Sequence, residues 1–133
     1  MGASQGDRFV VEGGRPVEGV LEPAGNKNEA LPVLAASLLA RGAVRLGNVP
    51  RIRDVTTLAE MLRELGVAVD ADAGASALHV DAATLSAREP SDLGHTIRGS
   101  FLLAPGLLHR TGQAVLPRPG GDRIGRRRLD THM

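Results

Sequence analysis

Residues 54–80, DVTTLAEMLRELGVAVDADAGASALHV, decide the fold class of this chain. The first half predicts a helix capped by Asp54 and ended by Gly66. Its apolar face repeats at helical spacing through Val55, Leu58, Met61, Leu62 and Leu65. Two apolar runs, 67–69 and 77–80, then predict strands on either side of a small acidic loop. A helix followed by two strands indicates an α/β fold.

The residues before this stretch extend the same alternation. Residues 26–40 predict a helix that Asn26 or Asn28 can cap, and residues 43–46 predict a strand. Residues 1–21 contain two short apolar runs around a Gly-Gly-Arg-Pro turn, which predict a strand hairpin. The expected order is therefore strand, helix, strand, helix, strand, strand.

The pattern restarts after residue 93. Thr96 is expected to cap a helix that runs to about residue 109 and bends at Pro105, and residues 113–116 are expected to form a strand. The chain then ends where another helix would follow. We therefore expect about one and a half α/β units, with residues 22–133 forming an incomplete domain that would favour self-association through uncovered sheet edges.

Composition narrows the chemistry. The 133 residues are 42% hydrophobic and carry a net charge of +1, and the absence of cysteine excludes disulfides, thiolate metal sites and a cysteine nucleophile. The four histidines lack metal-ligand spacing, so no metal is expected. No targeting segment or membrane span is recognisable, which favours a soluble cytoplasmic protein. Lys27 is the single lysine among sixteen basic residues.

Three segments could bind anions. Residues 25–28 open a helix with Lys27 and two asparagines, which suits an anion at the helix N-terminus or simply a capped helix with a solvated lysine. Arg98 lies at another expected helix start, where an arginine opposes the helix dipole. Residues 118–128 hold five arginines and one acidic residue beside glycines, which suits phosphate binding. The alternative for this last segment is an arginine-rich arm that contacts nucleic-acid phosphates. Asp122 lies among these arginines and could simply be paired with one of them.

Five motifs together resemble the enolpyruvyl transferases, and within them the members that act on UDP-N-acetylglucosamine. The motifs are GNKNEALP at 25–32 followed by LAASLLA at 34–40, NVPRIRDV at 48–55, IRGS at 97–100, PGG at 119–121, and IGRR at 124–127 with Asp130 and His132. The resemblance covers about residues 8–132, roughly the first third of such an enzyme. It implies an inside-out α/β barrel built from repeated βαβαββ units, with residues 1–21 packing on the second domain.

The resemblance also implies an activity and a set of site residues. Such enzymes move the enolpyruvyl group of phosphoenolpyruvate to the 3′-hydroxyl of UDP-N-acetylglucosamine with release of phosphate, without a cofactor, as the first committed step of peptidoglycan synthesis. Catalytic roles are implied for Lys27 and Asp122. The implied substrate-binding residues are Lys27, Arg98 and Arg127 for phosphoenolpyruvate, Asn28 for the sugar, and Arg127, Arg128, Leu129 and Asp130 on the uridine side.

Three residues depart from the family pattern. Asp122 stands where the family usually carries a mobile cysteine that fosfomycin alkylates, which implies fosfomycin resistance. Since an ordinary aspartate is ionised at neutral pH, Asp122 is expected to donate a proton only in the closed, substrate-filled site. Arg128 replaces a proline, and Glu29 replaces a small residue.

The resemblance leaves two other functions open. A relative that acts on shikimate 3-phosphate is the nearest alternative within the class, although the 119–130 segment disfavours it. A non-catalytic remnant that serves as a binding domain is the alternative from another class. No nucleic-acid partner is expected for the leading interpretation, and the 133 residues alone are expected to be inactive.

Overall fold

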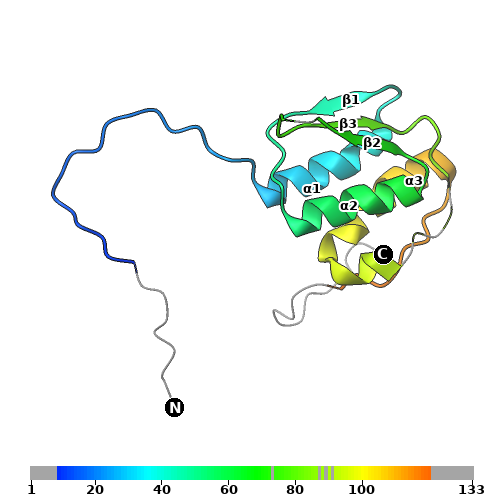
Figure 1. The fold of residues 1–133 in the computed structure, drawn as a ribbon. Coiled ribbons are helices and arrows are strands. Elements are labelled where there is room, and N and C mark those ends of the chain that lie inside the picture. Colours follow the sequence, from blue (N-terminus) through cyan, green and yellow to red (C-terminus); the bar gives the residue numbers. More distant parts are fainter. Residues whose placement is uncertain (1–8, 73, 87, 89, 91, 121–133) are drawn as a thin grey trace, which may run out of the picture.

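A three-stranded sheet with helices on one of its faces makes up the folded part of the chain (Figure 1). This computed structural model describes residues 9–72, 74–86, 88, 90 and 92–120. The α-helices and strands are α1 (Lys27–Ala36), β1 (Val44–Leu46), α2 (Arg53–Glu64), β2 (Ala68–Ala71), β3 (Leu78–Asp81) and α3 (Leu103–Thr111). Three 3₁₀ helices accompany them: η1 (Ser37–Leu39), η2 (Asp92–Thr96) and η3 (Arg98–Leu102). The expected α/β class is confirmed.

The sheet has the order β1-β3-β2, and β3 runs antiparallel to both neighbours. β1 and β2 are therefore parallel to each other, and β3 lies between them. The connection from β1 to β2 contains α2, which lies across one face of the sheet. Val80 of β3 lies opposite Val44 on one side and Val69 on the other. This register gathers the apolar residues on the face that the helices cover.

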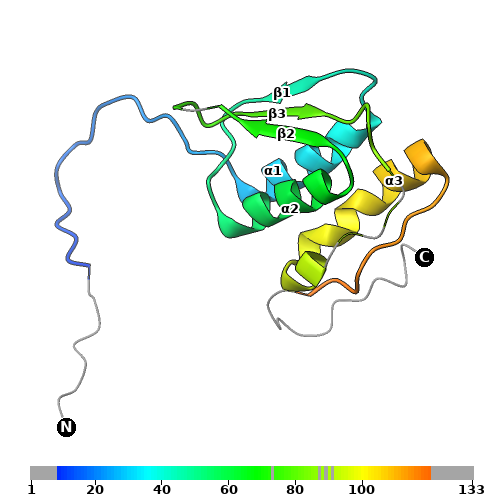
Figure 2. The same cartoon turned by 45° about the vertical axis from the view of Figure 1, so that its right-hand side comes forward.

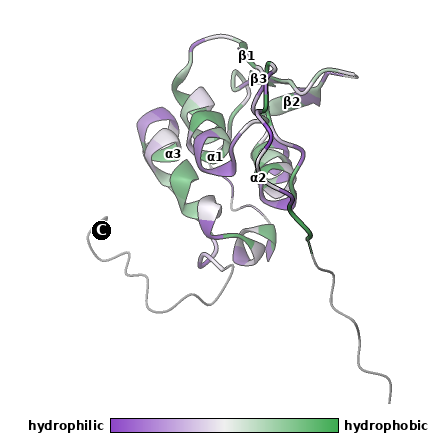
Figure 3. Cartoon of the chain, turned by 90° about the vertical axis from the view of Figure 1, so that its left-hand side faces the viewer, coloured by the Kyte–Doolittle hydropathy of each residue, from purple (hydrophilic) through white to green (hydrophobic). Residues whose placement is uncertain are grey.

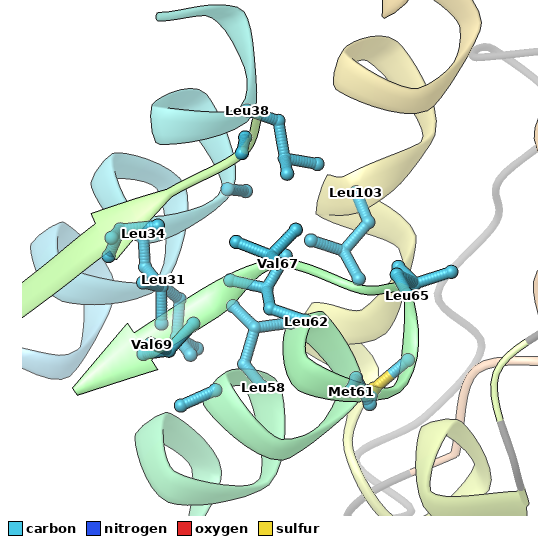
Figure 4. Close-up of a cluster of buried hydrophobic side chains, with 14 of the residues drawn as sticks. Leu31, Leu34, Leu38, Leu58, Met61, Leu62, Leu65, Val67, Val69 and Leu103 are labelled. Carbon is cyan, nitrogen blue, oxygen red and sulfur yellow. The ribbon is translucent and has the colours of Figure 1, made fainter. Parts of the chain in front are cut away.

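Leucine dominates the core between the helices and the sheet, as the low aromatic content requires (Figure 4). Leu58, Leu62 and Leu65 of the α2 region are all 0% exposed. Each such side chain contributes roughly 1.5–3 kcal/mol by leaving water. Figure 4 shows that this face of α2 meets Leu31, Leu34 and Leu38 from the α1 region and Leu103 from α3.

The helix pattern read from residues 54–65 is confirmed, but its start differs. α2 begins at Arg53, with Ile52 at the N-cap position, so Asp54 lies inside the first turn and does not cap the helix. Its carboxylate pairs with Lys27 instead. Figure 3 shows hydrophilic and hydrophobic residues side by side along α2, as an amphipathic helix requires.

The hairpin expected in the first 21 residues does not form among the described residues 9–21. This segment contains no strand, and Phe9, Val17 and Leu21 are 97%, 97% and 89% exposed. An isolated two-stranded hairpin is marginal in water, and here its apolar side chains contact no surface that would bury them. That this segment packs on a second domain stays a prediction.

The region after residue 91 also differs from expectation. Thr96 ends η2, where its hydroxyl donates to the Leu93 carbonyl, so it does not cap a helix. Pro105 falls in the first turn of α3, where a backbone N–H has no helical partner, so it sits at the start of this helix and does not bend it.

The strand expected at residues 113–116 is absent. The segment leaves α3 on the helical side of the sheet and returns toward η2, away from the sheet edges (Figure 2). Its Ala114 and Leu116 pack against the core. Within the described part of the chain, every helix is too short or too polar to span a bilayer.

Candidate active site

The first turn of α1 carries Lys27 and Asn28, two of the expected site residues. Asn26 is the N-cap residue, and its side-chain oxygen accepts a hydrogen bond from the Asn28 N–H at 2.7 Å. The Asn26 carbonyl accepts from the Glu29 and Ala30 N–H groups. These amides are already used within the helix start, so an anion bound here would be held chiefly by side chains.

Lys27 is held at the point where α1 and α2 begin. Its Nζ lies 2.9 Å from Oδ2 of Asp54, and the two side chains are 48% and 34% exposed. An ion pair this exposed contributes at most about 1 kcal/mol to stability. The pair brings the ammonium group of α1 to the first turn of α2.

The backbone that leads into α1 is packed against the loop between β1 and α2. A Cβ on Gly25 would overlap the carbonyl group of Asn48, so only glycine fits there. Asn48 adopts the left-handed conformation with φ 52°, and its Nδ2 donates to the Pro23 carbonyl at 3.3 Å. Together these contacts fix where α1, and with it Lys27, begins.

Arg98 opens η3, which packs against α1. The next residue, Gly99, lies against the side chain of Leu31, one helical turn after Lys27. Arg98 is half-buried. The structure therefore brings three expected site residues, Lys27, Asn28 and Arg98, to elements that pack on each other.

The remaining expected site residues lie outside the described residues: Asp122, Arg127, Arg128, Leu129 and Asp130. The described chain reaches Gly120, two residues before Asp122 in the sequence. Among the described residues, no group of three or more histidine, aspartate or glutamate side chains is arranged to hold a metal ion.

One pocket borders α2 and the β1–α2 loop, and a smaller one borders the start of α1, β1 and the same loop. Neither is lined by Lys27, Asn28 or Arg98. The larger, of about 580 Å³, lies between α2 and the turn from β2 to β3. Its charged lining mixes Arg51, Arg53 and Arg63 with Glu60 and Asp72. This mixture of both signs does not select a substrate, so we place the candidate site at the start of α1.

Sequence reasoning missed two contributors to this site. The position of Asp54 before an apolar helical pattern predicts a cap, whereas its pairing with Lys27, 27 residues away, has no local signal. Asn48 follows a glycine, a dipeptide typical of a turn, but its contact with Gly25 depends on packing.

Comparisons with known proteins identify the family of this chain. The sequence profile of the EPSP synthase (3-phosphoshikimate 1-carboxyvinyltransferase) family matches residues 11–133. A UDP-N-acetylglucosamine 1-carboxyvinyltransferase of Bradyrhizobium diazoefficiens is 50% identical over 127 residues, which cover 95% of this chain and 29% of that protein. One from Treponema denticola is 44% identical over 125 residues, covering 93% of this chain and 29% of that protein.

A solved structure carries the same fold. The enolpyruvyl transferase NikO from Streptomyces tendae superimposes with a TM-score of 0.64 at 33% identity, over 77% of this chain and 24% of that one. The small sheet and its helices are consistent with part of an inside-out α/β barrel. The chain thus spans about 29% of the length of the curated relatives it matches. On its sequence and on its fold, this chain belongs to the EPSP synthase family of enolpyruvyl transferases.

Proposed function

We propose that this chain contributes the Lys27 side of an active site that transfers enolpyruvyl from phosphoenolpyruvate to the 3′-hydroxyl of UDP-N-acetylglucosamine. The observation that carries the proposal is the 50% identity, over 95% of the chain, with a relative named for the UDP-N-acetylglucosamine reaction. The contact of Lys27 with Asp54, which joins the first turns of α1 and α2, supports it. The reaction would be the first committed step of peptidoglycan synthesis in the cytoplasm.

The chemistry explains why several cations are needed. The sugar hydroxyl gives its proton to a general base as its oxygen bonds to C2 of phosphoenolpyruvate, and C3 gains a proton. Phosphate then leaves from C2 as C3 loses a proton and the C2–C3 double bond forms again. Lys27, Arg98 and Arg127 would hold the phosphate and carboxylate charges through both steps. Asn28 would hold the sugar, and residues 127–130 would lie along the uridine. No metal or organic cofactor enters this scheme.

Asp122 would supply the proton to C3 once the site has closed around its substrates. An aspartate can hold a proton at neutral pH when burial or neighbouring anions disfavour its charged form, and the two bound substrates bring such anions. Because a carboxylate replaces the usual thiol, fosfomycin would find no cysteine to alkylate.

A hybrid enzyme tests the proposal most directly. In it, residues 11–133 replace the matching part of the Bradyrhizobium relative, and phosphate release is measured with both substrates. We expect turnover that Lys27→Ala abolishes and that Arg41→Ala, at an exposed loop position, leaves intact. A folded hybrid without turnover, or a Lys27→Ala hybrid with full turnover, would contradict the proposal.

The isolated chain tests the alternatives. We expect it to bind UDP-N-acetylglucosamine weakly and to release no phosphate steadily, since most of the relatives' length is missing from it. The family profile is named for the shikimate reaction, so preferential binding of shikimate 3-phosphate would support that substrate instead. Salt-sensitive binding of oligonucleotides without nucleotide-sugar binding would support a non-catalytic domain. Sedimentation of the chain would show whether it self-associates.

A further inference from the structure

The larger pocket, between α2 and the turn from β2 to β3, has no part in the proposed function. Its volume of about 580 Å³ lies within the range typical of small-molecule sites. A molecule bound there would touch none of the described residues assigned to the candidate active site, Lys27, Asn28 and Arg98.

Apolar side chains form the floor of this pocket. Val55 and Ala59 come from α2 and Ala77 from the residue before β3, and all three are buried. Ile52 and Leu78 also line the pocket and pack against the core. A ligand with an apolar part would gain free energy by moving that part from water onto this floor. The floor therefore favours a ligand with an apolar body.

Backbone hydrogen bonds hold two walls of the pocket in place. The Val49 N–H, in the loop before α2, donates to the Ser76 carbonyl at 2.7 Å. The Asp72 N–H donates to the Ala77 carbonyl at 3.0 Å and joins the two ends of the turn between β2 and β3. Because main-chain bonds support these walls, the pocket is formed before any ligand binds, as is usual for small-molecule sites.

Three arginines stand on the rim of the pocket. Arg51 and Arg53 are exposed side chains at the start of α2. Arg63 lies about three turns further along the same helix, and its Nε donates to the Val69 carbonyl at 2.8 Å. A guanidinium can pair with both oxygens of a carboxylate, so the rim favours an acidic group on the ligand.

Two carboxylates share the rim with these arginines. Asp72 already pairs with Arg45, with 3.6 Å between Oδ2 and Nη2, and Arg45 does not line the pocket. Glu60 is the second carboxylate, and it would oppose a ligand that carries several negative charges. This balance disfavours phosphoenolpyruvate, which has both a phosphate and a carboxylate, and favours a ligand with a single negative charge.

We propose that this pocket binds a small organic acid that carries one carboxylate on a compact apolar body. The carboxylate pairs with Arg51 and Arg53 at the start of α2, and the apolar body lies on the floor. The proposal goes beyond the transfer reaction and does not depend on it, because the pocket contains none of the residues assigned to that reaction.

The probe for this site is 2-naphthoate, which joins two fused apolar rings to one carboxylate. It is titrated into the isotope-labelled 133-residue chain, and the backbone amide shifts are followed by nuclear magnetic resonance. We expect saturable shifts at Val55, Ala59 and Ala77 on the floor. The neutral 2-naphthalenemethanol keeps the rings without the charge and should bind several-fold more weakly.

Matched variants test the rim and the volume separately. Arg51→Gln and Arg53→Gln each remove one charge at an exposed position and should raise the Kd by up to about fivefold, the upper end for an exposed ion pair. Ala71→Leu, at an exposed lining position of β2, partly fills the pocket and should weaken binding at unchanged charge. Arg41→Gln, in an exposed loop, removes the same charge elsewhere and should leave the Kd unchanged.

Several results would overturn the proposal. Shifts that do not saturate, or that fall on the exposed residues 9–21, would show non-specific apolar association. Equal affinity for the acid and the alcohol would exclude a site for acids. Equal weakening by Arg41→Gln and Arg51→Gln would reduce the effect to general charge attraction. The comparison of the two probes uses the unsubstituted chain, so it decides the matter even if a variant fails to fold.

Discussion

Arg110 joins three parts of the fold through one guanidinium group. From the last turn of α3, its Nη1 donates to the carbonyl oxygens of Leu38 and Ala40, both at 2.9 Å. Its Nη2 donates to the carbonyl of Ala82 at 3.0 Å. The side chain thus links α3 to the end of η1 and to the chain leaving β3. We predict that Arg110→Ala is strongly destabilising although the residue is only half-buried.

The magnitude follows from the number and kind of these bonds. A hydrogen bond to a charged group contributes about 1.5–3 kcal/mol, but water can replace part of this at a half-buried position. We therefore expect Arg110→Ala to lower the free energy of unfolding by about 2–4 kcal/mol. Arg110→Lys keeps the charge but lacks the planar fork that reaches three oxygens, so it should recover only part of the loss.

Urea unfolding followed by circular dichroism measures this effect. For a loss of this size the midpoint should fall by on the order of 1–2 M. Arg41→Ala is the matched control, because Arg41 lies in an exposed loop, and it should change the stability by less than about 0.5 kcal/mol. An Arg110→Ala variant as stable as the Arg41→Ala control, or an Arg110→Lys variant as stable as the parent, would refute the reasoning.

Three further predictions concern the candidate site. Asp54→Asn should lower the free energy of unfolding by less than about 1 kcal/mol, because its ion pair with Lys27 is exposed. The same variant should reduce kcat in the hybrid enzyme, and an unchanged kcat would exclude a role for Asp54 in positioning Lys27. Gly25→Ala should cost more than about 1 kcal/mol in urea unfolding, since its Cβ overlaps the β1–α2 loop, whereas Gly13→Ala, with open space around it, should be neutral. Asp122→Asn should abolish turnover in the hybrid, and full turnover would contradict the proposed proton donor. Fosfomycin should leave the mass of the unsubstituted chain unchanged, and an adduct on Asp122 would contradict the proposed resistance.

The extent to which sequence predicts the site depends on sequence distance. Asn26 was a candidate cap, and its side chain does accept the Asn28 N–H, because capping is decided within three residues. The pairing of Lys27 with Asp54 and the contact of His95 with Arg118 span 27 and 23 residues. The spacing of apolar residues along the sequence does not indicate such contacts, because they form only when separate elements pack together.

The sequence by itself determined α2, β2 and β3, since the spacing of their apolar residues already specifies which face can be buried. It could not determine the state of residues 9–21 or 113–116, which have strand-like composition but become strands only beside a partner strand. Among the residues that the structure describes, the first segment contacts no such partner, and the second follows the helices back to Gly94 and His95. Tertiary packing alone decided both, because a strand is stabilised by hydrogen bonds to another part of the chain, whereas a helix makes its own.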